Sequence, residues 1–364
     1  MTTIKLRNAD NLSVLDDNSI GDTIIVGNGI NDTVRADLSQ SDTITLGNGA
    51  GDTVNLLVNN PFALGSENDT ITLGNGAGDR VNLIGASGDT ITLGNGAGDT
   101  VHAIPSENDW AIRSSTIILG NGAGDTVSIA GGGHDTITLG NGAGDTVSLG
   151  IGIPNDDNTI TVGNGDGDSV KVDGSLASGN TIIVGNGAHD SVSFGGSNET
   201  IKVGSGNSDT VVNRGGSGNT ITLGNGAGDV VDDLNGRSDT IKVGNGNDTI
   251  YVGANDTVTV GIGHDSFVFG QTTAGNIGAV TVTGFNPTKD SFTFSTQLTT
   301  SVSYHDNAQG NAVITVDNNP ADTITLVGVH AVDLHPSDFH FADPTAVTPD
   351  AHVTAMAAAH SILL

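Results

Sequence analysis

Aspartate recurs in this chain at spacings that could line up carboxylates along one edge of a repeating structure. Each of these residues follows a glycine-rich turn, as in Gly47-Asn-Gly-Ala-Gly-Asp-Thr-Val54. Hard cations prefer carboxylate and backbone carbonyl oxygens, and such turns expose carbonyls beside the carboxylate, so the pattern favours Ca²⁺ binding. We name the series row A, and all twelve members are aspartate: Asp32, Asp52, Asp79, Asp99, Asp125, Asp145, Asp168, Asp190, Asp209, Asp229, Asp248 and Asp265. Candidate carbonyl ligands include those of Gly47, Gly49, Gly244, Gly246, Gly261 and Gly263.

A second series, row B, alternates with row A and precedes strands of the type Asp-Thr-Ile. Its members vary in type: Asp22, Asp42, Asp69, Asp89, Ser115, Asp135, Asn158, Asn180, Glu199, Asn219, Asp239 and Asp256. From row B to row A the interval is 10 residues in ten coils and 9 in the last two, whereas from row A to row B it varies from 8 to 17. Loops vary where nothing constrains them, so the row A edge is the constrained one.

The elements that position these rows are short strands. In Asp42-Thr-Ile-Thr-Leu46, Ile44 and Leu46 share one face, and Thr43 and Thr45 share the other. This alternation predicts a strand with its apolar side inward. Two strands in each coil of about 20 residues, repeated about twelve times, predict an all-β, right-handed parallel β-roll whose coils bury their aliphatic residues against their neighbours.

Stacked coils would place successive row A carboxylates about 4.8 Å apart. At that distance two carboxylates repel by ~0.9 kcal/mol in water and ~3.5 kcal/mol at an effective dielectric constant of about 20. The row must therefore be neutralised by cations or held by hydrogen bonds. The hydrogen-bonded alternative is a metal-free structural solenoid, in which each aspartate caps its own turn. The turn asparagines could then form a side-chain ladder: Asn28, Asn48, Asn75, Asn95, Asn121, Asn141, Asn164, Asn186, Asn225 and Asn245.

Composition restricts the classes of partner. The 364 residues include 55 Gly and no Cys, and the net charge is -30. The absence of cysteine excludes disulfides and thiolate metal sites. The acidity argues against nucleic acid and anionic membranes as partners and suits cations. The apolar runs are too short for a membrane-spanning helix, and residues 1–10 lack the apolar core of a cleaved signal peptide.

Catalytic motifs were sought and not found. The sequence holds no H-E-x-x-H, no G-x-S-x-G and no Walker loop, so we expect no enzyme activity and assign no catalytic residue. The acidic pairs Asp156-Asp157 and Asp232-Asp233 are interpreted as solvated turns rather than acid–base pairs. His134, His189 and His264 fill a variable turn position, and Trp110 is expected to fold over the roll.

The segment Gly244-Asn-Gly-Asn-Asp-Thr-Ile250 resembles the nonapeptide G-G-x-G-x-D-x-U-x of repeats-in-toxin (RTX) proteins, with Val243 in place of the first glycine. Gly261 to Phe269 is similar to the last turn of such arrays. Most turns here are one residue longer than the family turn. The resemblance implies Ca²⁺ held between stacked coils by the row A carboxylates and turn carbonyls, most directly at Asp248 and Asp265.

The region after Gly270 is similar to the C-terminal region of RTX proteins exported by type I systems. Val280 to Phe294, Asp322 to Val329 and Leu334 to Phe341 are expected to form capping strands. The Ala-rich tail would be an uncleaved secretion signal, which implies an extracellular or cell-surface protein. The expected divisions are an irregular N-terminal cap (1–20), the roll (21–270), a β cap (271–343) and the tail (344–364).

The biological role has more than one candidate. The favoured one is a secreted Ca²⁺-binding roll that folds outside the cell and serves as a structural or adhesin-like module. Loops 57–68 and 103–114 would contact a cell-surface or glycan partner. The outward threonines of the row B strands form an array like that of ice-binding solenoids, which gives the alternative: Thr43/Thr45, Thr70/Thr72, Thr90/Thr92, Thr136/Thr138, Thr159/Thr161 and Thr220/Thr222.

Overall fold

The structure is a computed structural model that describes residues 2–17, 20–37, 39–56, 67–85, 87–105, 112–150, 155–172, 174, 176–270 and 276–342. It confirms the predicted all-β parallel solenoid of about twelve turns, and the described residues contain no α-helix. The chain divides into two compact units. Unit 1 comprises residues 1–210 and 214–226, and unit 2 comprises residues 211–213 and 227–364.

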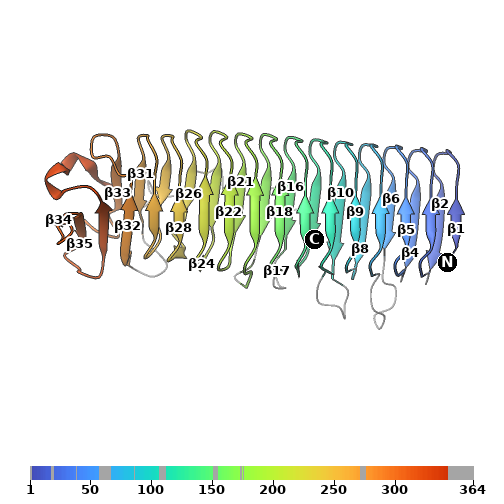
Figure 1. Cartoon of the computed structure of the whole chain (residues 1–364), viewed down its shortest axis with the longest axis horizontal. Helices are drawn as coiled ribbons and strands as arrows, with labels where there is room; N and C mark the ends of the chain where they lie inside the picture. The colour runs from blue at the N-terminus through green and yellow to red at the C-terminus, as the bar shows by residue number, and fades with distance from the viewer. Residues whose placement is uncertain are drawn as a thin grey trace. The chain divides into compact units, whose positions relative to one another are not determined.

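Unit 1 is built from two parallel sheets, and its strands stand side by side in chain order (Figure 1). The row B sheet contains β1 (Thr3–Lys5), β3 (Thr23–Ile25), β5 (Thr43–Thr45), β7 (Thr70–Thr72), β9 (Thr90–Thr92), β12 (Thr116–Ile118), β15 (Thr136–Thr138), β18 (Thr159–Val162), β20 (Thr181–Val184), β22 (Thr200–Val203) and β25 (Thr220–Leu223). The row A sheet contains β2 (Ser13–Asp17), β4 (Thr33–Asp37), β6 (Thr53–Leu56), β8 (Arg80–Ile84), β10 (Thr100–Ile104), β13 (Thr126–Ile129), β16 (Thr146–Leu149), β19 (Ser169–Val172) and β21 (Ser191–Phe194). The short strands are β11 (Ile112–Arg113), β14 (Gly132–Gly133), β17 (Asn155–Asp156) and β24 (Gly216–Ser217).

Unit 2 continues the same pattern and then adds a meander. Its parallel strands are β26 (Val230–Asp232), β28 (Thr240–Lys242), β29 (Thr249–Tyr251), β30 (Thr257–Thr259), β31 (Ser266–Phe269), β32 (Ala279–Thr283), β33 (Ser291–Ser295) and β37 (Phe339–Ala342). The antiparallel meander is β34 (Val302–Asp306), β35 (Ala312–Val316) and β36 (Thr323–Val327). The remaining elements are β27 (Gly236–Arg237) and two 3₁₀ helices, η1 (Ala331–Asp333) and η2 (Pro336–Asp338). The boundary between the two units falls within strand β23 (Thr210–Asn213).

The predicted alternation is confirmed in the core. Ile44 is fully buried and Leu46 is 1% exposed, whereas Thr43 is exposed. Successive coils align residue for residue: Ile44 pairs with Ile24 on one side and with Ile71 on the other. A single apolar position per strand therefore builds a continuous aliphatic column.

Residues 1–20 differ from the irregular cap that we expected. Strands β1 and β2 lie in this segment and pair in parallel with β3 and β4, with Thr3 opposite Thr23 and Ser13 opposite Thr33. The segment therefore forms a coil of the solenoid. Its strands lack the glycine-rich turn that marks the later coils, so the sequence pattern missed them.

Strands β32, β33 and β36 lie in the segments expected after residue 276, whereas Leu334 to Phe341 contains η2 and only the start of β37. The ring centroids of Phe269 in β31 and Phe294 in β33 stack 5.2 Å apart in the core.

Several segments named from the sequence lie outside the described residues: the tail from residue 343, residues 57–66 of one loop, and residues 106–111 of the other, which include Trp110.

Candidate metal centres

The row A carboxylates form a ladder that runs from coil to coil. From Asp52 to Asp209, and again at Asp248 and Asp265, Oδ1 accepts a hydrogen bond from the backbone N–H of the row A residue in the preceding coil, as from Asp79 to Asp99 and from Asp99 to Asp125, both at 3.0 Å. Asp32 Oδ1 accepts the N–H of Leu12 instead. The bond repeats at 2.8–3.1 Å through unit 1 up to Asp209 and through unit 2 from Asp229. All twelve side chains are 0–2% exposed. The structural alternative predicted a cap on each aspartate's own turn, but the bond goes to the neighbouring coil.

The ladder ends on an aspartate that the sequence analysis did not assign to row A. Asp290 Oδ1 accepts the N–H of Asp265 at 2.9 Å, and its Oδ2 accepts the N–H of Asn286 at 2.7 Å. The sequence signal is the similarity of Asp290-Ser-Phe-Thr-Phe294 to Asp265-Ser-Phe-Val-Phe269, and Ser266 pairs with Ser291. Both oxygens of Asp290 therefore have backbone donors.

The second carboxylate oxygen of row A has no such donor. Oδ2 is buried without a hydrogen-bond partner in ten members: Asp32, Asp52, Asp79, Asp99, Asp125, Asp145, Asp168, Asp190, Asp248 and Asp265. A buried carboxylate oxygen without a donor or cation is costly. The described row therefore requires either protons or metal ions on these atoms.

Turn carbonyls approach the same atoms. A Cβ built on Gly49 would lie 1.5 Å from the carbonyl oxygen of Gly29 and 3.2 Å from Asp52 Oδ2. A Cβ on Gly29 would lie 1.9 Å from the carbonyl oxygen of Ala9 and 2.8 Å from Asp32 Oδ2. Carbonyl and carboxylate oxygens therefore meet beside the glycine, and this donor set suits Ca²⁺. The carbonyls of Gly29 and Ala9 were not among the predicted ligands. Two carbonyls that were, those of Gly47 and Gly244, accept N–H bonds from the next coil.

Row B makes the same coil-to-coil bond with other residue types. Ser115 Oγ accepts from Asp89, and Asn158 Oδ1 accepts from Asp135, at 3.3 and 2.9 Å. Asn180, Glu199 and Asn219 also accept this bond through their side-chain oxygens. Any side-chain oxygen of suitable reach therefore completes the ladder. Since row A is always aspartate, that row needs the carboxylate for something besides the hydrogen bond.

The turn asparagines form the ladder that the structural alternative predicted. Asn121 donates its backbone N–H and its Nδ2 to Asn95 Oδ1, at 2.9 and 3.0 Å. The same pair of bonds links Asn141 to Asn121 and Asn164 to Asn141. The asparagine ladder holds the exposed side of the turn, while row A lies buried behind it. The two ladders coexist, so the asparagines do not explain the carboxylates.

Burial raises the pKa of the row A carboxyls. Desolvation is the largest cause, adjacent carboxylates add to it at several positions, and the N–H bond from the preceding coil opposes it. The pKa rises to about 7 at Asp79 and Asp190, and to about 6 at Asp125, Asp168, Asp248 and Asp265. Part of the row would therefore hold protons at neutral pH unless a cation replaces them.

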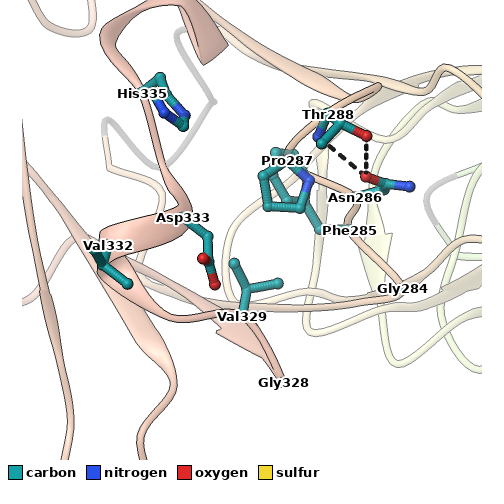
Figure 2. Close-up of a pocket in the computed structure, with 10 residues that line it drawn as sticks. All are labelled: Gly284, Phe285, Asn286, Pro287, Thr288, Gly328, Val329, Val332, Asp333 and His335. Carbon is teal, nitrogen blue, oxygen red and sulfur yellow. Dashed lines mark hydrogen bonds between the residues drawn. The ribbon is translucent and has the colours of Figure 1, made fainter.

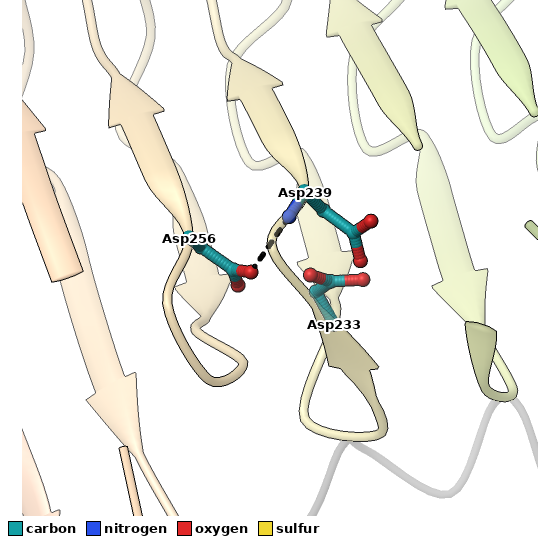
Figure 3. Close-up of side chains that lie close together, drawn as sticks. All are labelled: Asp233, Asp239 and Asp256. Carbon is teal, nitrogen blue, oxygen red and sulfur yellow. Dashed lines mark hydrogen bonds between the residues drawn. The ribbon is translucent and has the colours of Figure 1, made fainter. Parts of the chain in front are cut away.

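Three acidic ligand groups converge elsewhere, at Asp233, Asp239 and Asp256. Within the described ranges this is the group whose ligand atoms all lie within 4.8 Å of one another. Asp233 follows β26, Asp239 precedes β28 and Asp256 precedes β30, and Figure 3 shows the three side chains on adjacent segments. Their exposed fractions are 0%, 1% and 0%. The expectation of a solvated turn is therefore wrong for Asp233, which lies in the interior.

The repeating pattern of buried apolar residues is interrupted at Asp233. The position four residues after each row A aspartate is apolar and buried in ten coils: Ala36, Leu56, Leu83, Ala103, Ile129, Leu149, Val172, Phe194, Val252 and Phe269. In two consecutive coils it is Asn213 and Asp233, both fully buried. Asn213 Nδ2 donates to Asp233 Oδ1 at 2.7 Å and to Asp239 Oδ2 at 3.1 Å. The pair Asp232-Asp233 thus carries a signal beyond the solvated turn that was predicted for it: Asp233 interrupts the buried apolar position.

Backbone donors account for only part of the Asp233–Asp239–Asp256 cluster. Asp256 Oδ1 accepts the N–H of Asp239 at 3.0 Å, and Oδ2 accepts the N–H of Gly253 at 2.7 Å. Asp233 Oδ2 is buried and has no partner. Desolvation, followed by the charges of Asp256 and Asp239, raises the pKa of Asp233 well above its ordinary value. Desolvation also raises the pKa of Asp256, to about 6.

Two of the histidines named from the sequence lie near row A, because charge interactions with His189 and His264 oppose the rise in the pKa of Asp209 and Asp265 that desolvation causes. His134 and His189 hold left-handed turn positions, with φ values of 61° and 63°, and His264 Nδ1 lies 3.2 Å from the carbonyl of Lys289. Asp157 is exposed, as expected for a turn. The described residues contain no helix that is long and apolar enough to cross a membrane.

A surface cavity of about 560 Å³ lies beside the meander of unit 2 (Figure 2). Asn286, Thr288, Asp333 and His335 are among its polar lining residues. Asn286 Oδ1 accepts both the N–H and the hydroxyl of Thr288, at 3.0 and 2.8 Å. Asp333 Oδ2 accepts the N–H of His330 at 3.4 Å. These bonds close local turns, and the Asp333 and His335 side chains are exposed.

Comparison with known proteins adds little to this geometry. The sequence matches no protein-family model and no curated protein sequence. Among solved structures, the chain is similar to one described as "a new PL6 alginate lyase complex with trisaccharide", at 12% identity and a TM-score of 0.23, over 96% of this chain and 97% of that one. A similarity this weak carries no argument about function. The description of the fold and of the two carboxylate clusters therefore depends on the contacts within this chain alone.

Proposed function

We propose that this protein is a secreted, Ca²⁺-binding β-roll, similar to RTX arrays, that completes its folding when Ca²⁺ binds to row A outside the cell. One observation carries the proposal. Row A is uniformly aspartate and leaves one buried carboxylate oxygen without a donor in ten of its members, while row B makes the same hydrogen bond with serine and asparagine. A cation that binds Oδ2 explains why row A needs the carboxylate.

In this mechanism bound Ca²⁺ would neutralise the row A carboxylates, whose Oδ2 atoms receive no hydrogen bond in ten members. The row A carboxylates and carbonyls such as that of Gly29 would hold the ions, while each Oδ1 keeps its bond to the preceding coil. Without the ions, burial and mutual repulsion oppose ionisation of the row and weaken the stack. Binding energy thus becomes folding energy. An array that is loose at low Ca²⁺ would suit export from a Ca²⁺-poor cytoplasm.

We assign the folded roll a non-catalytic, extracellular role as a structural or adhesin-like module. A roll that is regular and acidic can present loops at fixed spacing along its variable edge. Loops 57–68 and 103–114 would serve as the contact with a cell-surface or glycan partner.

The proposal is tested with two matched triple variants. In the row A triple variant, Asp99, Asp125 and Asp145 become Asn, which keeps an oxygen acceptor for each ladder bond. In the exposed triple variant, Asp10, Asp157 and Asp166 become Asn, which gives the same change in net charge at the surface. Equilibrium dialysis should find fewer bound Ca²⁺ ions per chain in the row A triple variant and an unchanged number in the exposed one. Equal numbers in the wild type and both variants would show that row A holds no Ca²⁺, as in the metal-free alternative for this row.

Ice binding is the second candidate, favoured by the register of the threonines. Thr23, Thr43 and Thr70 occupy one column of the row B sheet, and Thr45 and Thr72 occupy the next. The second column is interrupted, because Ile118 stands opposite Thr92 and Thr138.

An ice-binding face predicts thermal hysteresis in the wild type and a lower value in Thr43→Tyr, because a bulky side chain would disrupt the flat array. Ser128→Tyr on the other sheet is the control and should leave the hysteresis unchanged. Wild-type protein without hysteresis would remove this candidate.

A further inference from the structure

The cluster of Asp233, Asp239 and Asp256 lies apart from row A and has no counterpart in the other coils that the structure describes. It arises because Asp233 occupies a position that is apolar and buried in ten coils. A carboxylate in an apolar column destabilises the fold unless a partner compensates it. Such a residue therefore requires a specific interaction, and its nearest polar neighbours are two more acids and one amide.

We propose that Asp233, Asp239 and Asp256 bind one Ca²⁺ ion in the interior of unit 2. Three observations carry this inference: the convergence of the three ligand atoms, the buried Oδ2 of Asp233 that receives no hydrogen bond, and the close approach of two carboxylate oxygens to Gly236. The inference does not depend on the proposed role of row A.

The spacing of the ligand atoms fits one ion. They lie within 4.8 Å of one another. Ca²⁺ holds oxygens at about 2.3–2.6 Å, so two ligands of the same ion can be up to about 5 Å apart. The Asp233 carboxyl points toward that of Asp256, within hydrogen-bonding reach. Its residue is fully buried, and its Oδ2 receives no hydrogen bond from a described donor.

The backbone at this site allows the carboxylates to come close and adds oxygens. A Cβ on Gly236 would lie 2.3 Å from both Asp233 Oδ1 and Asp239 Oδ2, so only glycine leaves room here for these two oxygens. A Cβ on Gly253 would lie 2.4 and 2.7 Å from the carbonyl oxygens of Asp233 and Gly236, and 2.9 Å from Asp256 Oδ2. Backbone carbonyls therefore lie beside the carboxylates, as in many Ca²⁺ sites.

The donor set selects among cations. All the groups named here are hard oxygens, which excludes metals that prefer thiolate or imidazole. Mg²⁺ requires a near-ideal octahedron and keeps several of its waters, whereas Ca²⁺ accepts irregular sets of protein oxygens. A site whose three carboxylates are almost fully buried therefore favours Ca²⁺. The ion would join the three successive segments that carry these aspartates and stiffen this part of unit 2.

The test compares substitutions that the chain itself already tolerates. Asp239→Asn keeps the row B acceptor, because Asn158 and Asn180 make the equivalent bond in other coils. Asp135→Asn is the matched control: Asp135 accepts the same bond, but its row B neighbours are Ser115 and Asn158. Ca²⁺ per full-length chain is counted by dialysis and elemental analysis, with far-UV circular dichroism as the check on folding.

Asp239→Asn is expected to bind one Ca²⁺ fewer than the wild type, and Asp135→Asn is expected to bind the same number. Gly236→Ala, which fills the space without a change of charge, should also lose one ion, and it decides the matter if Asp239→Asn fails to fold. Equal counts in all variants, or the same loss in Asp135→Asn, would overturn the inference. If row A binds no Ca²⁺, the wild-type count falls to one and the comparison still applies.

Discussion

In the presence of a chelator, the β-sheet signal of this protein is expected to weaken as the pH is raised from about 4 to about 8, and Ca²⁺ is expected to restore it. Burial raises the pKa of several row A carboxyls from 3.8 to about 6 or 7, so over this range the folded chain binds more protons than the unfolded chain. The free energy of unfolding therefore falls as the pH rises, and the stabilisation by protons is lost once the folded-state pKa values are passed.

Ca²⁺ should have its largest effect near neutral pH, where it replaces these protons. Each site that binds the folded state alone contributes about 2.7 kcal/mol when the free Ca²⁺ concentration is about 100 times its dissociation constant. Far-UV circular dichroism with chelator, Ca²⁺ or Mg²⁺ measures this directly.

The triple variants separate the buried row from the general acidity of the chain. The row A triple variant should depend less on pH and on Ca²⁺ than the wild type, because asparagine does not ionise and Nδ2 places a donor where Oδ2 had no partner. The exposed triple variant should behave like the wild type. A wild-type spectrum that is fully β in chelator at every pH would contradict the link between row A and folding.

Gly76→Ala is expected to destabilise the Ca²⁺-loaded protein by about 3 kcal/mol or more, which is large for the addition of one methyl group. A Cβ at Gly76 would lie 1.6 Å from the carbonyl oxygen of Gly49 and 2.5 Å from its carbonyl carbon. Because these are backbone atoms of the stacked coil below, no rotation of a side chain can relieve the clash. The coils must separate locally, and the loss should appear as a lower thermal midpoint.

Gly78 provides the comparison two residues away. Its φ is +75°, and a Cβ there would have no heavy atom within 4 Å. Gly78→Ala should cost only the left-handed strain, about 1–2 kcal/mol. Gly78→Asn should cost less still, since Asn31 holds the equivalent position with φ +56°. Equal midpoints for Gly76→Ala and Gly78→Ala would show that the turns are not packed as tightly as the structure indicates.

The sequence was sufficient for the architecture because one local rule repeats. The alternation at Ile44 and Leu46 predicts the core face, and the constant interval between the rows predicts which edge is constrained; the burial and register of these residues agree. Residues 1–20 were predicted to be irregular because they contain no glycine-rich turn. Their strands are formed by pairing with the coil that follows.

The site chemistry was predictable only in part. Sequence identified row A, but the direction of its hydrogen bonds depends on how stacked coils align, which no single repeat encodes. The Asp233 cluster forms from three segments of the chain that only the fold brings together. Its one sequence signal is the polar pair Asn213 and Asp233 at a core position, which appears only when all the coils are aligned. Asp290 was missed because it lies beyond the last glycine-rich turn.

The termination of the row A ladder at Asp290 gives the stack a built-in polarity. In unit 2, Asp229, Asp248 and Asp265 each donate the backbone N–H to a carboxylate supplied by the chain that follows, and the final acceptor, Asp290, is held by the N–H of Asn286 on its second oxygen. That terminal bond pattern is complete without an ion, whereas Oδ2 of Asp248 and Asp265 has no donor. The Asp290 end can therefore form first and act as a template on which the preceding coils of unit 2 assemble one after another.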